Sequence, residues 1–210
     1  MACAYCRLSG HNSSTCPEPN RMVNAVHHSI SEPSQGLVYD FGDGNGPVPS
    51  HRHTNPDGSP GGWIADTAHV SANAHVSANA CVYGSAQVYG SAQVYGSAQV
   101  YGDAQVHGNA CVYGRACVYG RAYVYGDACV YESAHVSGDA WVYGHAWVSG
   151  NAQVYGNACV SGNARVHGRA RVSGDACVYG NARVSDSAHV SGNAHVSGFA
   201  KMQGYEEVST

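Results

Sequence analysis

The sequence predicts an all-β protein built as a parallel β-solenoid, and three observations carry this prediction. One unit of six residues repeats without an insertion from residue 62 to residue 205. Alanine recurs every sixth residue from Ala68 to Ala200, twenty-three times in phase. A valine follows two residues after each alanine, from Val70 to Val196, and Met202 closes the series. Self-similarity at a fixed period indicates a repeat architecture.

Each unit predicts one short strand and one corner. Alanine and valine are two residues apart, so in an extended chain their side chains share one face while the second and fourth residues point the other way. Valine, and the tyrosine that often takes the fourth place, favour a half-buried strand. Glycine in the fifth place and Asn, Asp or Ser in the sixth are typical of corners.

Two folds could use such a unit. If the corners were hairpin turns, the chain would form a meander whose Ala and Val face is open to water. If each corner turns the chain only partway, the strands wind into a coil and all these side chains enter one interior. Burial contributes roughly 0.8 kcal/mol per CH2, and the chain has more than twenty such valines. We therefore expect the coil, stabilised by stacking between neighbouring turns.

The run Val70-Ser71-Ala72-Asn73-Ala74-His75-Val76 resembles the hexapeptide repeat of left-handed β-helix proteins, with an aliphatic residue followed by a small residue four places later. The resemblance covers about two thirds of the chain. It implies a triangular prism with three units per turn and about eight turns. It also implies a left-handed coil, against the usual right-handed crossover.

Four residues depart from the glycine of the fifth place, namely Ala72, Ala78, Glu132 and Asp186. A residue other than glycine seldom has a positive φ. We therefore expect that the fifth place does not demand a positive φ. The alternative is local strain at Glu132 and Asp186.

Composition limits the remaining possibilities. The net charge is −4, and no stretch approaches the 18 consecutive apolar residues of a membrane span. The N-terminus lacks the basic and apolar regions of a signal peptide. Nine cysteines without an export signal favour a reducing compartment, with metal binding or free thiols before disulfides. We expect a cytoplasmic protein, and mild acidity argues against a broad nucleic-acid surface.

Residues 1–17 hold the strongest chemical motif. Cys3, Cys6, His11 and Cys16 have the spacing C-x2-C-x4-H-x4-C. Three thiolates and one imidazole this close suit a closed tetrahedral site, so we expect one Zn²⁺. A chance cluster in a disordered tail is the alternative.

This spacing, with Gly10 directly before His11, resembles the CCHC zinc knuckle of nucleic-acid-binding proteins. The resemblance implies recognition of single-stranded nucleic acid, with Tyr5 stacking on a base and Arg7 contacting phosphate. Arg7 stands where the family has glycine, and basic neighbours are few. A protein partner for the knuckle is the alternative.

Residues 18–61 hold six of the seven prolines and many Gly, Ser and Asn residues. They predict a linker that also caps the first turn near Trp63, because terminal repeats need a cap. Residues 36–41 could form one short strand. Residues 51–53, His-Arg-His, suggest a metal or phosphate cluster, but a solvated loop is the interpretation we favour. Residues 206–210 are expected to be a C-terminal tail after the β-helix of residues 62–205.

With three units per turn, side chains at the same place in successive turns stack into outward columns. Stacked Gln and Tyr side chains stabilise parallel strands, but an exposed aromatic belt can also mark a contact surface. Eight aromatic residues are the candidates for such a surface: Tyr83, Tyr89, Tyr95, Tyr101, Tyr113, Tyr119, Trp141 and Trp147.

Two further columns have alternative interpretations. The column of Arg165, Arg183 and Lys201 could meet an anionic partner or be a solvated edge, and we favour the edge. The column of Cys159, Cys177 and His195 could hold a metal or present free thiols. We favour thiols, because in-register side chains are poorly placed for tetrahedral ligation.

The sequence favours a non-enzymatic structural or interaction solenoid that carries a zinc-knuckle tag. The alternative is a hexapeptide-repeat acyltransferase, active or inactive. Such enzymes, as the family implies, interrupt the repeat with a loop, and no loop interrupts residues 68–205. His107, His135, His145 and His167 are candidate bases without a visible acidic partner.

We expect a homo-oligomer and no membrane association. The resemblance and the aromatic belt favour three rods side by side. End-to-end pairing through the strand edges of the last turn is the second expectation.

Overall fold

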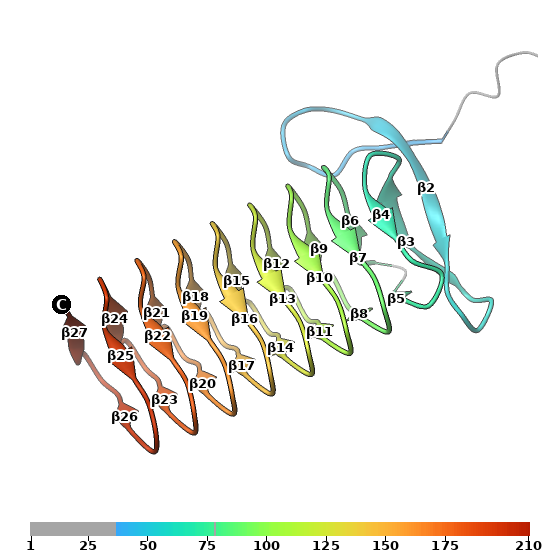
Figure 1. The fold of residues 1–210 in the computed structure, drawn as a ribbon. Helices are drawn as coiled ribbons and strands as arrows, with labels where there is room; N and C mark the ends of the chain where they lie inside the picture. Colours follow the sequence, from blue (N-terminus) through green and yellow to red (C-terminus); the bar gives the residue numbers. More distant parts are fainter. Residues whose placement is uncertain (1–36, 78) are drawn as a thin grey trace, which may run out of the picture. The chain divides into compact units, whose positions relative to one another are not determined.

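The computed structural model describes residues 37–77 and 79–210. The predicted zinc ligands Cys3, Cys6, His11 and Cys16, together with Tyr5 and Arg7, lie outside this range. The described chain forms a parallel β-solenoid of about eight turns, in which the turns follow one another along one axis (Figure 1). The predicted all-β solenoid is confirmed, and its three sheets fit a triangular turn.

Each turn contributes one strand to each of three sheets. The cap sheet contains β1 (Val38–Tyr39), β2 (Val48–Thr54), β3 (Pro60–Ala65), β6 (Cys81–Val82), β9 (Gln99–Val100), β12 (Cys117–Val118), β15 (His135–Val136), β18 (Gln153–Val154), β21 (Arg171–Val172), β24 (His189–Ser191) and β27 (Glu207–Ser209). The Trp141 sheet contains β4 (His69–Val70), β7 (Gln87–Val88), β10 (Gln105–Val106), β13 (Tyr123–Val124), β16 (Trp141–Val142), β19 (Cys159–Val160), β22 (Cys177–Val178) and β25 (His195–Val196). The Trp147 sheet contains β5 (His75–Val76), β8 (Gln93–Val94), β11 (Cys111–Val112), β14 (Cys129–Val130), β17 (Trp147–Val148), β20 (Arg165–Val166), β23 (Arg183–Val184) and β26 (Lys201–Met202).

The register of the repeat is one full turn, so each strand pairs with the strand three units further along the chain. From β3 onward neighbouring strands pair in parallel, as Gln105 pairs with Tyr123 and Val106 with Val124. The last strand, β27, pairs with β24 and falls in the stretch that the sequence suggested as a tail.

The core is a stack of alanines and valines. Those of the repeat are fully buried from Ala74 to Val190, and Val196 and Met202 are nearly so. The second and fourth residues point outward, as the alternation of a strand requires. The predicted inward face is therefore confirmed.

The corner glycines have a positive φ, but Ala72 shows that the fifth place does not strictly demand one. The fifth-place glycines have φ between 61° at Gly192 and 76° at Gly114. Glu132 and Asp186 adopt the same conformation, with φ of 61° and 57°. Ala72, the described alanine in this place, is not among the residues with positive φ.

Glu132 and Asp186 therefore carry the local strain that the alternative interpretation described. A non-glycine residue in the left-handed region costs on the order of 1–3 kcal/mol. Each residue has a compensating contact to the next turn. The Gly150 N–H donates to Glu132 Oε2 at 2.5 Å, and the Gly204 N–H donates to Asp186 Oδ2 at 3.1 Å. Hydrogen bonds to a charged group are stronger than neutral ones and offset part of the strain.

The segment before the repeat closes the first turn. β2 pairs antiparallel with both β1 and β3, and the Tyr39 ring stacks on Trp63 at 4.6 Å. Buried His53 Nε2 lies 3.0 Å from the Ala74 carbonyl oxygen, and the Val76 N–H donates to the Asn55 side chain at 2.9 Å. These contacts satisfy edge groups of β5 that would otherwise be open.

The two histidines of residues 51–53 do not form a cluster. His51 is exposed, with Nδ1 2.8 Å from Asp66 Oδ1, whereas His53 is buried against the first turn. The sequence did not indicate β2, because its residues carry no simple alternation of apolar and polar side chains.

A side chain at the corner can cost stability through backbone strain and through a clash with the next turn. Gly180 and Gly198 allow these two costs to be measured separately. Both have a positive φ, but a Cβ would meet the Gly198 nitrogen at 3.0 Å in the first case and nothing within 4 Å in the second. We expect Gly198→Ala to cost about 1 kcal/mol for backbone strain. Gly180→Ala should cost about 1–3 kcal/mol more, because neighbouring turns must separate. The melting temperatures of both variants are measured by circular dichroism. If Gly180→Ala and Gly198→Ala lower the melting temperature equally, close stacking at the corner is unimportant.

Candidate functional site: the outward columns and the Ser149 groove

Fourth-place aromatic rings form stacked ladders along the solenoid. Tyr83, Tyr101 and Tyr119 are stacked with centroid separations of 4.8 and 4.9 Å and are parallel within 3°. Tyr113 and Tyr131 form a second ladder, with a separation of 4.9 Å. The ring spacing matches the strand spacing of about 4.8 Å. The ladders are thus a direct product of the register.

His107 takes the place of a ring in a third ladder. It lies 4.7 Å from Tyr89 and 5.0 Å from Tyr125, parallel to each within 6°, and Tyr125 stacks in turn on Tyr143 at 4.9 Å. Partial burial lowers the pKa of His107, because the charged imidazolium would lose hydration. The neutral form that stacks as an aromatic ring is therefore favoured.

The eight predicted surface aromatics lie in three environments. Tyr83 is buried beneath Phe41, whose ring is 4.6 Å away, and burial raises the pKa of Tyr83. The half-buried members are Tyr89, Tyr95, Tyr101 and Tyr119. The exposed members are Tyr113, Trp141 and Trp147. That these eight residues form an interaction surface stays a prediction.

A serine interrupts each of the three ladders near the middle of the solenoid. Ser137 follows Tyr119, Ser149 follows Tyr131 and Ser161 follows Tyr143, each one turn later in the same column. Ser149 and Ser161 are only 7% and 8% exposed, although they point outward. Ser137 and Ser149 each line a hollow of the surface between larger neighbours of their column.

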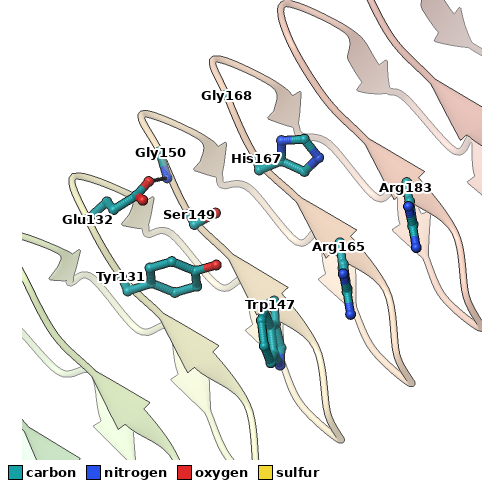
Figure 2. Close-up of a pocket in the computed structure, with 9 residues that line it drawn as sticks. All are labelled: Tyr131, Glu132, Trp147, Ser149, Gly150, Arg165, His167, Gly168 and Arg183. Carbon is teal, nitrogen blue, oxygen red and sulfur yellow. Dashed lines mark hydrogen bonds between the residues drawn. The ribbon is translucent and has the colours of Figure 1, made fainter.

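The hollow at Ser149 is a groove of about 390 Å³ on the Trp147 sheet. Tyr131 and His167 lie at its two ends along the column (Figure 2). Trp147, Arg165 and Arg183 lie on the successive strands β17, β20 and β23 (Figure 2). The Arg165 guanidinium carbon lies 5.0 Å from the centroid of the Trp147 ring, a cation–π contact.

The two arginines lack acidic partners in the described part of the chain. Arg165 and Arg183 are exposed, and neither is within ion-pair distance of a described carboxylate. The stretch from residue 165 to residue 201 holds five of the ten Lys and Arg residues, although the whole chain has a net charge of −4. Arg165, Arg183 and Lys201 are in register. The column of Arg165, Arg183 and Lys201 is therefore locally cationic.

The described cysteines are half-buried thiols. Burial and the neighbouring Cys111 raise the pKa of Cys129 to about 11, and burial also raises the pKa of Cys177, so both stay protonated at neutral pH. Cys159, Cys177 and His195 are in register on the Trp141 sheet. Within residues 37–77 and 79–210, no three His, Cys, Asp or Glu side chains converge as metal ligands.

One candidate base has an acidic neighbour that the sequence did not reveal. His145 Nδ1 lies 3.4 Å from Asp127 Oδ2, and Asn109 donates to the same carboxylate at 3.0 Å. These residues share one corner column, and the register of one turn brings them together. His145 and Asp127 are both exposed, which is typical of a surface ion pair.

The Ser149 groove was not predicted from the sequence. Its signal was present as a serine one turn after Tyr131 and one turn before His167, next to the arginine column. The absence of an aromatic ring at Ser149, in a column that holds tyrosines, is the feature that indicates the groove.

Together these features define a β-solenoid repeat protein. Three stretches, residues 152–168, 170–186 and 176–192, match the family model described as the YdcK beta solenoid repeat. They include the turns that carry Arg165 and Arg183. No curated protein matches the chain. The described residues include no helix that is long and apolar enough to cross a membrane.

Proposed function

We propose that this protein is a non-enzymatic interaction solenoid that associates with copies of itself through the Trp141 sheet. The observation that carries the proposal is the lack of charge on this face. Neither the strands of this sheet nor the fourth-place residues that follow them include Asp, Glu, Lys or Arg. The other two sheets carry outward arginines, Arg171 on the cap sheet and Arg165 and Arg183 on the Trp147 sheet.

Aromatic side chains concentrate on the uncharged face. Trp141 is 44% exposed and packs on Tyr123 at 5.0 Å, and Tyr179 on the same side is also exposed. Interface centres are depleted in charge and enriched in Tyr and Trp. A second copy would meet this face without like-charge repulsion. The likeness to hexapeptide-repeat proteins, whose coil is left-handed, supports three rods side by side.

Binding is favoured over catalysis because the repeat offers no loop. From β4 to β26 every connection is a short corner, and catalytic groups are usually carried by longer loops. A hexapeptide acyltransferase would need such a loop. Ser149 and His167 both line the Ser149 groove, but among the described residues no hydrogen bond joins the hydroxyl to the imidazole, as an activated nucleophile would require.

We further propose that Cys3, Cys6, His11 and Cys16 hold one Zn²⁺ and form a tag that binds single-stranded nucleic acid or protein. The spacing of the four residues supports this. Elemental analysis of protein purified without chelator should find about one zinc per chain. Cys6→Ser should lose the zinc and leave the solenoid melt unchanged, because the solenoid has its own core. Protein without zinc would contradict the tag.

Light scattering at micromolar concentration tests the association. The wild-type mass should be three times the chain mass of 21.8 kDa. Trp141→Arg should be monomeric, because a desolvated charge without a partner is costly at an interface. Gln153→Arg puts the same charge on the exposed cap sheet and should leave the trimer intact. A monomeric wild type, or equal behaviour of the two variants, would contradict the proposal.

A further inference from the structure

We infer that the Ser149 groove binds a small planar aromatic ring that carries an anionic group, such as a nucleoside monophosphate. The ring would occupy the missing position of the tyrosine ladder, and the anion would lie on Arg165 and Arg183. This inference goes beyond self-association and does not depend on it, because the groove lies on the Trp147 sheet.

The vacancy has the thickness of one ring. Tyr131 and His167 belong to one column and are two turns apart, which corresponds to about 9.6 Å at a strand spacing of about 4.8 Å. A ring midway between them would lie about 4.8 Å from each. This is the spacing at which Tyr113 already stacks on Tyr131, 4.9 Å. The bottom of the slot is Ser149, whose small side chain is 7% exposed.

The cations beside the slot suit a phosphate. Arg165 and Arg183 are in register on adjacent strands, and guanidinium groups bind phosphate through two parallel hydrogen bonds. The Trp147 ring beneath Arg165 restrains that side chain before a ligand arrives. No described carboxylate competes with the ligand for either arginine.

The groove also has one acidic residue, Glu132, which sets the orientation of the ligand. Its carboxylate lies at the corner, where Oε2 accepts the Gly150 N–H (Figure 2). Arg165 on β20 and Arg183 on β23 lie on the side of Ser149 that faces away from this corner (Figure 2). An anionic group is therefore repelled from the corner and attracted toward the arginines.

A second vacancy provides an internal control. Ser137 lies between Tyr119 and Tyr155 in the ladder of the cap sheet, in a hollow of about 360 Å³. His135 and Gln153 stand at the places of Trp147 and Arg165, and Arg171, at the place of Arg183, does not line this hollow. The two slots have the same missing ring but differ in charge. Only the Ser149 slot should select an anionic ring.

Isothermal titration of the full-length chain at low salt tests the site with three ligands. AMP carries both ring and anion, adenosine only the ring, and inorganic phosphate only the anion. We expect AMP to bind with a Kd below about 1 mM. Adenosine and phosphate should each bind at least tenfold more weakly. If phosphate binds as tightly as AMP, the groove is only a cationic surface that does not recognise a ring, and the inference is overturned.

Variants locate the binding. Ser149→Tyr fills the vacancy with the ring of the neighbouring turns and should weaken AMP binding at least tenfold, without a fall in melting temperature. Ser137→Tyr fills the control slot and should bind AMP as the wild type does. Arg183→Gln should weaken AMP binding about tenfold and leave adenosine binding unchanged, which keeps the test decisive if Ser149→Tyr folds poorly. Trp141→Arg should still bind AMP, so failure of self-association is distinguishable. Undiminished AMP binding by Ser149→Tyr or Arg183→Gln would contradict the site.

Discussion

The stacking of each turn on the next, in a register of three repeat units, is the constraint on which the rest of the structure depends. Alanine and valine fill an interior only one side chain deep, and backbone hydrogen bonds join turn to turn, as from the Gln105 N–H to the Ala122 carbonyl. The corner glycines keep the turns in contact. Their positive φ and their close approach to the next corner leave little room for a Cβ. Where Glu132 replaces glycine, its carboxylate bonds to the next turn and offsets part of the strain.

The uniform core leaves the specificity of the molecule to its outward columns. Because every turn has the same interior, side chains one turn apart in a column meet at the strand spacing whatever they are. Identical rings then form ladders, such as Tyr83–Tyr101–Tyr119, and cations form rows, such as Arg165 and Arg183. A change of one residue in a column creates a local feature without disturbing the core. The Ser149 groove arises in this way.

The repeat itself could be predicted from residue types at fixed spacing. Alanine and valine indicate the period and the inward face, and glycine followed by Asn, Asp or Ser indicates the corners. The positive φ of Glu132 and Asp186 was given only as the alternative, because the rarity of that conformation was weighed above the geometry of the glycine corners. β2 was missed because it is held by hydrogen bonds to β1 and β3 and by the polar contacts of His53 and Asn55, which have no periodic signal. The groove was missed because it depends on the combination of three columns.

The central claim is that only the inward alternation and the stacking determine the fold, and deletions test it most directly. Removing one turn, residues 86–103, or one unit, residues 92–97, keeps every alanine and valine inward. Both variants should melt cooperatively by circular dichroism, at similar temperatures. Removing residues 92–94 reverses the alternation downstream, places valine in water and tyrosine in the core, and should give an unfolded or aggregated chain. A three-residue deletion that melts like the other two would contradict the account.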